Sequence, residues 1–174
     1  MNRVSKVMLN TAWLPAIWLT ANVSAQVSEA IAERDGTVIA KLHAEGAQVY
    51  ECKLDPGKSP SAARTLTWQF REPIAALFAD GKSIGRHYAG PNWDHIDGSG
   101  VEGKVIASTP GVKPNDIPWL KLDVISKRGS GVLTSVTTVQ RINTAGGKLD
   151  GACDKAGATK SAPYSAEYIF LRKG

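Results

Sequence analysis

The sequence predicts an all-β fold, an antiparallel β-sandwich or β-barrel of about eight strands with one disulfide. From residue 37 onward, short runs of β-branched and aromatic residues are separated by glycine, proline, aspartate and asparagine, which is typical of antiparallel strands and turns. Helical periodicity is almost absent from the same stretch. The only two cysteines, Cys52 and Cys153, both lie within it.

The first 25 residues have the three parts of a secretory signal peptide. Arg3 and Lys6 precede a mostly apolar stretch, and small residues follow up to Ala25. We therefore expect cleavage after Ala25, a single all-β domain over residues 26–174, and an exported protein that is periplasmic or secreted. The apolar stretch is shorter than the about 20 residues that span a bilayer, so no stable membrane insertion is expected.

Eight runs are predicted as strands because turn residues bound each of them. They cover residues 37–42, 47–53, 64–71, 82–88, 101–108, 119–126, 132–142 and 163–172. Short turn sequences at 45–46 and 128–131 predict hairpins, so strands that are neighbours in sequence should pair. Alanine and leucine predict isolated helical turns at 28–33 and 73–78.

In two of the predicted strands, apolar residues alternate with other residues, as expected when one face of the strand is buried. The residues on the predicted core faces are Leu66, Trp68 and Phe70 in one strand, and Tyr164, Ala166, Tyr168 and Phe170 in the other.

Export would place both cysteines where disulfides persist, so a Cys52–Cys153 bridge is expected. In the chain-entropy model, closing a loop of about 100 residues contributes roughly 4 to 5 kcal/mol. The alternative, a metal or redox pair, needs cysteines that are closer in sequence.

Polar and aromatic residues are densest between His87 and Ser99, where the sequence reads HYAGPNWDHIDGS. Turn signals at 90–91 and 97–98 predict a loop between strands, and loops carried on a rigid sheet often bind ligands. The basic residues behind the net charge of +5 are spread along the chain, so no nucleic-acid partner is expected.

Five ordered motifs resemble a family of exported bacterial and fungal proteins catalogued as domain of unknown function three-four-five-five. They lie at 46–52, 87–99, 117–120, 141–147 and 164–168. The resemblance implies no agreed function, although some fungal relatives carry a malate dehydrogenase label. This chain lacks the glycine-rich strand-to-helix turn that such a nicotinamide enzyme needs.

We expect a non-catalytic domain that binds a small molecule or a glycan through this loop. Aromatic rings would supply flat apolar contacts and carboxylates would supply hydrogen bonds. The candidate residues are His87, Tyr88, Trp93, Asp94, His95, Asp97 and Trp119.

A metal site is an alternative, with His87 and His95 as ligands beside Asp94 or Asp97, and His43 as a further candidate. This spacing matches neither a His-Glu-x-x-His helix nor a Cys-His zinc module. Apart from that metal, no cofactor is expected.

A hydrolase is a second alternative, with Asp94 and Asp97 as an acid and base pair, or either of them with Glu102. No Gly-x-Ser-x-Gly turn is present for a serine hydrolase. A structural protein of the cell envelope is the third, in which Arg141 anchors a carboxylate of the loop. The oligomeric state is left open.

Overall fold

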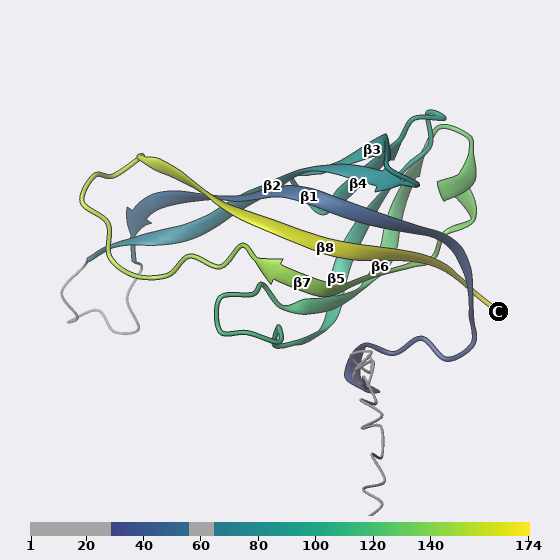
Figure 1. The fold of residues 1–174 in the computed structure, drawn as a ribbon, viewed down its shortest axis with the longest axis horizontal. Helices are drawn as coiled ribbons and strands as arrows, with labels where there is room; N and C mark the ends of the chain where they lie inside the picture. The colour runs from purple at the N-terminus through teal and green to yellow at the C-terminus, as the bar shows by residue number, and fades with distance from the viewer. Residues whose placement is uncertain (1–28, 56–64) are drawn as a thin grey trace, which may run out of the picture.

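The computed structural model describes residues 29–55 and 65–174, and the predicted signal peptide lies outside the described residues. Eight antiparallel strands form one sheet that closes into a barrel in sequence order, with β8 beside β1 (Figure 1). The predicted all-β fold with its single disulfide is confirmed. Of the two predicted architectures, the barrel is the one observed.

The strands are β1 (Gly36–Leu54), β2 (Leu66–Ala79), β3 (Lys82–Tyr88), β4 (Asn92–His95), β5 (Gly100–Thr109), β6 (Trp119–Arg128), β7 (Thr138–Gly146) and β8 (Thr159–Lys173). Two short 3-10 helices accompany them, η1 (Glu29–Ile31) and η2 (Val132–Ser135). Strands that are neighbours in sequence pair as predicted, and η1 falls within the predicted helical turn at 28–33.

The predicted hairpin at 45–46 is wrong, because β1 runs through it without a turn. Gly46 lies opposite Ala75 of β2 and Tyr164 of β8. A Cβ atom built at Gly46 would lie 2.5 Å from the Cα of Ala75 and closer still to the carbonyl oxygen of Ile74. This glycine therefore permits close packing of strands and does not mark a turn.

Three other element predictions are also wrong. Residues 73–78 belong to β2, where buried Ala75 and Leu77 alternate with more exposed neighbours, because strand pairing overrides a weak helical propensity. The predicted loop from His87 to Ser99 contains β4 and the end of β3. Residues 132–142 divide into η2 and β7, so 128–131 does not form a simple hairpin.

β1, β2 and β8 are longer than the other strands and project together at one end of the barrel (Figure 1). The Cys52–Cys153 disulfide ties the connection before β8 to this projection. Backbone hydrogen bonds hold the same connection, with the Cys52 nitrogen 2.8 Å from the Ala158 oxygen and the Gly157 nitrogen 2.9 Å from the Cys52 oxygen. We call this part of the molecule the projecting end.

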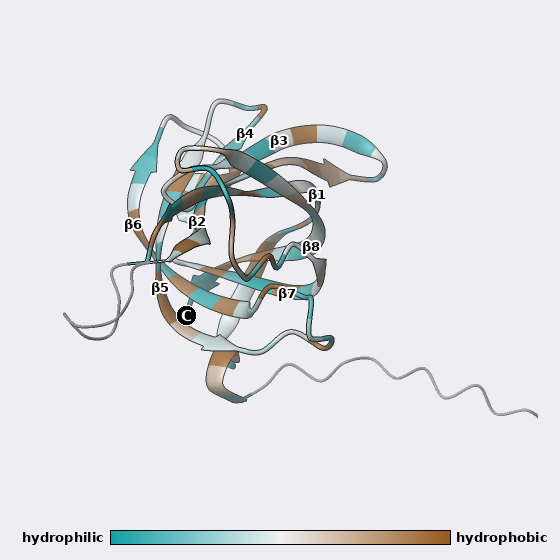
Figure 2. Ribbon diagram, turned by 90° about the vertical axis from the view of Figure 1, so that its left-hand side faces the viewer, coloured by the Kyte–Doolittle hydropathy of each residue, from teal (hydrophilic) through white to brown (hydrophobic). Residues whose placement is uncertain are grey.

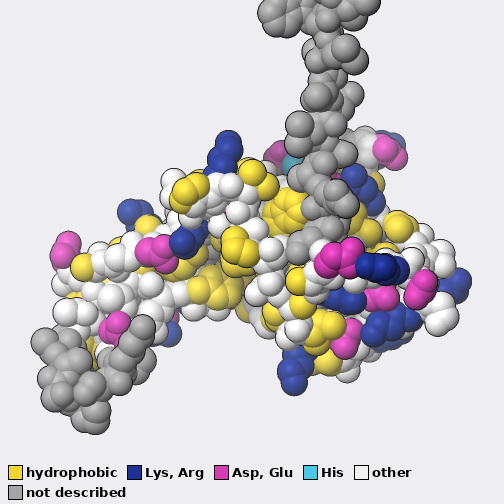
Figure 3. Space-filling view, turned by 90° about the horizontal axis from the view of Figure 1, so that it is seen from below, with side chains coloured by type: hydrophobic (Ala, Val, Ile, Leu, Met, Phe, Trp, Pro, Cys, Tyr) yellow, Lys and Arg dark blue, Asp and Glu magenta, His cyan; other side chains and the backbone are white. Residues whose placement is uncertain are grey.

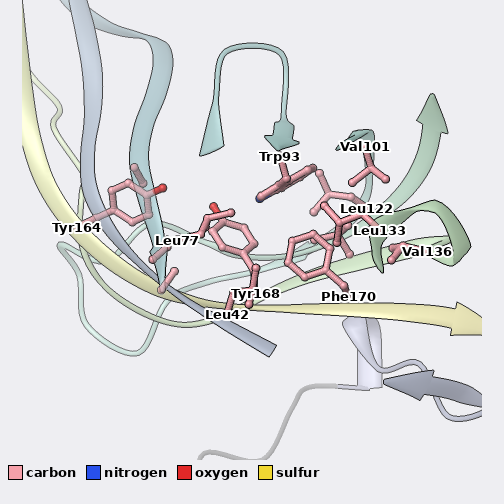
Figure 4. Packing of buried hydrophobic residues seen from close by; sticks show 14 of the residues in the cluster. Leu42, Leu77, Trp93, Val101, Leu122, Leu133, Val136, Tyr164, Tyr168 and Phe170 are labelled. Atoms are coloured by element: carbon pink, nitrogen blue, oxygen red, sulfur yellow. The ribbon is translucent and has the colours of Figure 1, made fainter. Parts of the chain in front are cut away.

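Inward-facing side chains fill the barrel interior, around which the strands curve in Figure 2. Trp93, Tyr168 and Phe170 form the largest part of it, and their rings meet edge to face (Figure 4). The predicted core face of β8 is confirmed. The predicted core face of β2 is wrong, since Phe70 is 55% exposed and Leu66 and Trp68 are half-buried at the projecting end.

The 3-10 helix η1 packs on the outside of the barrel. Its Ile31 is buried, the Gln140 side chain donates to the Ile31 carbonyl at 2.5 Å, and Lys121 pairs with Glu33 at 3.0 Å. Figure 3 shows hydrophobic side chains on one face of the molecule, with acidic and basic groups spread around them. No helix among the described residues is long and apolar enough to cross a membrane.

Candidate functional site

The barrel contains a cavity of about 300 Å³ between its interior and the projecting end. Residues from all eight strands and from two connections line it, with aromatic and aliphatic groups in the majority. Its volume is at the lower end of the roughly 300 to 1,000 Å³ of small-molecule sites. The cavity is therefore large enough for one small ligand.

His87 and Trp93 form one wall of the cavity. They lie opposite each other on β3 and β4, and their rings stack at 4.6 Å with an angle of 9° between the planes. Trp93 is 1% exposed, and the Cβ of a side chain at Gly103 would lie 3.1 Å from its indole. The absence of a side chain at Gly103 thus leaves room for the indole.

His87 is held as a neutral base. Its Nδ1 lies 2.8 Å from the carbonyl oxygen of Asn92, and since a carbonyl only accepts, Nδ1 carries the proton and Nε2 keeps a lone pair. Burial lowers the pKa of His87 to about 3, and the charge of Arg141 lowers it further. The ring therefore faces the cavity uncharged at neutral pH.

Arg141 places a buried cation in the same cavity. It lies on β7 opposite Leu120 of β6 and Tyr168 of β8, so its side chain points into the barrel with theirs. Only 9% of the residue is exposed. Its Nε and Nη2 both donate to the Pro118 carbonyl, at 3.0 and 2.9 Å, and no carboxylate among the described residues forms an ion pair with it.

Three further polar side chains line the cavity with buried atoms that have no hydrogen-bond partner in the described part of the chain. These atoms are Nε2 of Gln48, Nε1 of Trp93 and the hydroxyl of Tyr168. Burial raises the pKa of Tyr168, so its hydroxyl stays protonated. Figure 4 shows the hydroxyl ends of Tyr164 and Tyr168 turned toward each other beside Trp93. Buried polar atoms are normally satisfied. Tyr168 has Tyr164 and Arg141 as polar neighbours, and Gln48 has Tyr164, so the Trp93 nitrogen is the clearest unused donor.

Most of the remaining lining is apolar, and the exposed Arg71 is its charged member. Phe70, Pro73, Ile117, Leu120 and Leu122 are its main contributors. A more open depression of about 790 Å³ adjoins the cavity and shares four of its residues, Tyr50, Phe70, Ile117 and Pro118. The depression and the cavity therefore lie side by side.

Tyr88 and Asp94 lie outside the cavity, in a network of exposed and half-buried polar groups. Asp94 accepts from Arg86 at 2.9 Å and from Arg128 at 2.8 Å, and Tyr88 donates to it at 3.3 Å. Despite the opposing effect of burial, the hydrogen bonds from Arg128 and Arg86 lower the pKa of Asp94. The expectation that Arg141 anchors a loop carboxylate is wrong, because Arg128 and Arg86 do so.

Asp97 and His95 shape the turn between β4 and β5. Asp97 accepts from the Ser99 hydroxyl, from the Ser99 nitrogen at 2.9 Å and from the Val132 nitrogen at 2.7 Å. The Ser99 hydroxyl bond is the main cause that lowers the pKa of Asp97. His95 Nδ1 lies 3.0 Å from the same carboxylate. Because Asp94 and Asp97 are bound to different groups, the geometry does not favour a shared acid and base pair.

The predicted metal ligands are also engaged elsewhere. His87 uses Nδ1 on Asn92, and His95 uses Nδ1 on Asp97. His43 lies on β1 and contacts Glu167 at 2.9 Å. Among the described residues, no three His, Cys, Asp or Glu side chains gather closely enough to hold a metal ion.

Of the seven predicted ligand residues, His87 and Trp93 line the cavity and the other five do not. Trp119 is 4% exposed at the start of β6, away from the lining. Since Trp93 is buried, an exposed stacking platform for a glycan lacks its main residue. The sequence reasoning missed Gln48 and gave Arg141 only as the anchor of a loop carboxylate, although Arg141 follows Val139 at the spacing of one strand face.

Comparison with protein families gives one match, which spans residues 32–172 and is described as "Protein of unknown function (DUF3455)". The chain belongs to this family. The matched range includes all eight strands except the last residue of β8, so the barrel and its cavity fall within the DUF3455 domain. No curated protein and no solved structure matches the chain.

Proposed function

We propose that this DUF3455 protein binds one small, largely apolar molecule in the barrel cavity and does not transform it. The observation that carries the proposal is the cavity of about 300 Å³, lined mostly by aromatic and aliphatic side chains and adjoining an open depression. Closed barrels with such interiors can hold a single ligand.

The polar groups near the cavity support binding without catalysis. His87 is buried, and its Nδ1 proton is committed to a backbone carbonyl. The two aspartates that would form an acid and base pair serve the outer network and a turn. What remains in the cavity is a majority of hydrogen-bond donors and one acceptor, Nε2 of His87, which suits recognition.

The experiment measures binding of the uncharged apolar dye N-phenyl-1-naphthylamine by its increase in fluorescence. We expect saturable binding at one site per chain. Leu120→Trp fills the cavity and is expected to weaken dye binding about tenfold or more, because the indole would occupy the ligand volume. Ile125→Trp, at an exposed position of the same strand, should bind the dye like the unmodified protein.

Absence of saturable dye binding would overturn the proposal. So would equal binding by the Leu120→Trp and Ile125→Trp variants, because the dye would then be bound elsewhere. Circular dichroism of both variants checks that each keeps its β-structure.

A further inference from the structure

We infer that the cavity ligand carries a single carboxylate, which Arg141 binds while the apolar body of the ligand fills the rest of the cavity. This inference rests on the proposed function and names the chemical class of the ligand.

The first support is the uncompensated charge of Arg141. A guanidinium is charged at all relevant pH values, and burying a charge without a partner is costly. Arg141 is nine-tenths buried, and its guanidinium donates two hydrogen bonds to one neutral carbonyl, that of Pro118. That carbonyl orients the guanidinium but does not neutralise it. A ligand anion would supply the missing charge.

The second support is the polarity of the other unused groups. The amide nitrogen of Gln48 and the indole nitrogen of Trp93 can only donate hydrogen bonds, and the Tyr168 hydroxyl can donate one. All three atoms are buried and lack a well-formed hydrogen bond among the described residues. The Tyr168 hydroxyl lies near Tyr164 and Arg141, and Nε2 of His87 is the one acceptor set against these donors. A site with this excess of donors suits a ligand group that only accepts, as a carboxylate does.

The third support is the balance of charge and apolar surface. Arg141 is the sole cation among the inward-facing residues deep in the cavity, since the other lining arginine, Arg71, is exposed. One buried cation matches a monoanion better than a phosphate that carries nearly two charges. The lining of Leu120, Leu122 and Ile117 then suits an alkyl or aromatic body.

The test compares decanoate with decanol, which share a ten-carbon chain and differ in the anionic group. Each displaces N-phenyl-1-naphthylamine from the purified protein. We expect decanoate to bind about tenfold or more tightly than decanol, because hydrogen bonds to charged groups are the stronger ones. Arg141→Gln should weaken decanoate binding by about tenfold or more and change decanol binding by less than about threefold.

Two further variants keep the result interpretable. Arg172→Gln removes an exposed arginine of β8 and should leave both affinities unchanged. Arg141→Lys keeps the charge without the planar fork, so it should retain part of the preference for decanoate if Arg141→Gln does not fold.

Equal affinities for decanoate and decanol would overturn the inference and leave the proposed function standing. An equal loss for both ligands in Arg141→Gln would also overturn it, because Arg141 would then only support the fold. If the dye itself does not bind, the proposed function fails first.

Discussion

At the scale of single residues, the barrel interior holds two basic side chains in different states. Arg141 keeps its charge, while burial and the nearby guanidinium keep His87 neutral. Both residues line the same cavity. The interior therefore carries one positive charge, that of Arg141, and an anion that enters would meet this single charge.

His87 should make the stability of the protein depend on pH. Its pKa is about 3 when folded, against an ordinary value of 6.5. Between these values the unfolded chain binds a proton that the folded chain does not, so the free energy of unfolding falls as pH falls from about 6.5 toward 3. The slope from this group is at most about 1.4 kcal/mol per pH unit.

His87→Phe is the variant that checks this expectation, because it keeps an aromatic ring beside Trp93 and cannot titrate. It should be less stable at pH 7, since the bond to Asn92 is lost, but should lose less stability between pH 7 and pH 5 than the unmodified protein. Urea unfolding at the two pH values measures both quantities.

His43 provides the contrast. Its hydrogen bond to Glu167 raises its pKa, so its contribution to stability is present at acidic pH and is lost as pH rises. His43→Gln should therefore steepen the loss of stability on acidification. If His87→Phe loses as much stability between pH 7 and pH 5 as the unmodified protein, then His87 is not the cause of that loss.

The candidate site was only partly predictable because its residues come from distant parts of the sequence. His87 and Trp93 belong to one dense motif and were found. Gln48, Arg141 and Tyr168 come from β1, β7 and β8, and only closure of the barrel brings them together. The available signal was Arg141 itself, a charged residue at an inward position of a strand.

At the scale of elements, β1 shows that glycine inside a strand can be a packing residue. Gly46 lies midway along a 19-residue strand, and the backbone of β2 occupies the space of a Cβ atom. A sequence pattern cannot distinguish this role from that of a turn, because both require glycine. The same ambiguity explains why two strands were predicted where one exists.

Gly46→Ala should therefore destabilise the barrel by about 3 kcal/mol, the upper part of the range for overpacked sites, because backbone atoms cannot move aside as a flexible side chain would. Chemical unfolding monitored by circular dichroism measures the change. Ala145→Val adds volume at an exposed strand position and should change stability by less than about 0.5 kcal/mol. Similar values for the two variants would show that β2 can shift to accept the methyl group.

Most strands were predictable from local pattern, and the exceptions depend on neighbours. β3, β5 and β6 begin within one residue of their predicted starts. β4 is four residues long, lies within the polar motif and is a strand through pairing with β3 and β5. The second half of β2 has helical propensity but pairs along β1, so tertiary contacts decide its conformation.

At the scale of the whole molecule, the disulfide joins residues 101 positions apart and ties the projecting end together. Replacing Cys52 and Cys153 together by alanine should lower the free energy of unfolding by as much as roughly 4 to 5 kcal/mol. The barrel itself should persist, because the backbone bonds from Cys52 to Ala158 and Gly157 do not need the sulfur atoms.

Urea unfolding and amide hydrogen exchange would measure the two effects of this double variant. We expect a lower midpoint and faster exchange in the connection before β8, with slow exchange retained in β7 and in the barrel part of β8. The unmodified protein treated with a reductant should behave in the same way. An unchanged midpoint would mean that the bridge adds nothing to the stability of the fold.

The pairing of β8 with β1 has a consequence for how the protein is made. A ribosome releases β1 first and β8 last of the eight strands, so a growing chain can build the meander from β1 to β7 but cannot close it. Gln48 of β1 and Tyr168 of β8 both line the cavity, and they come into one lining only at that final step. The ligand site should consequently be absent from every nascent intermediate and appear at once when synthesis of β8 is complete.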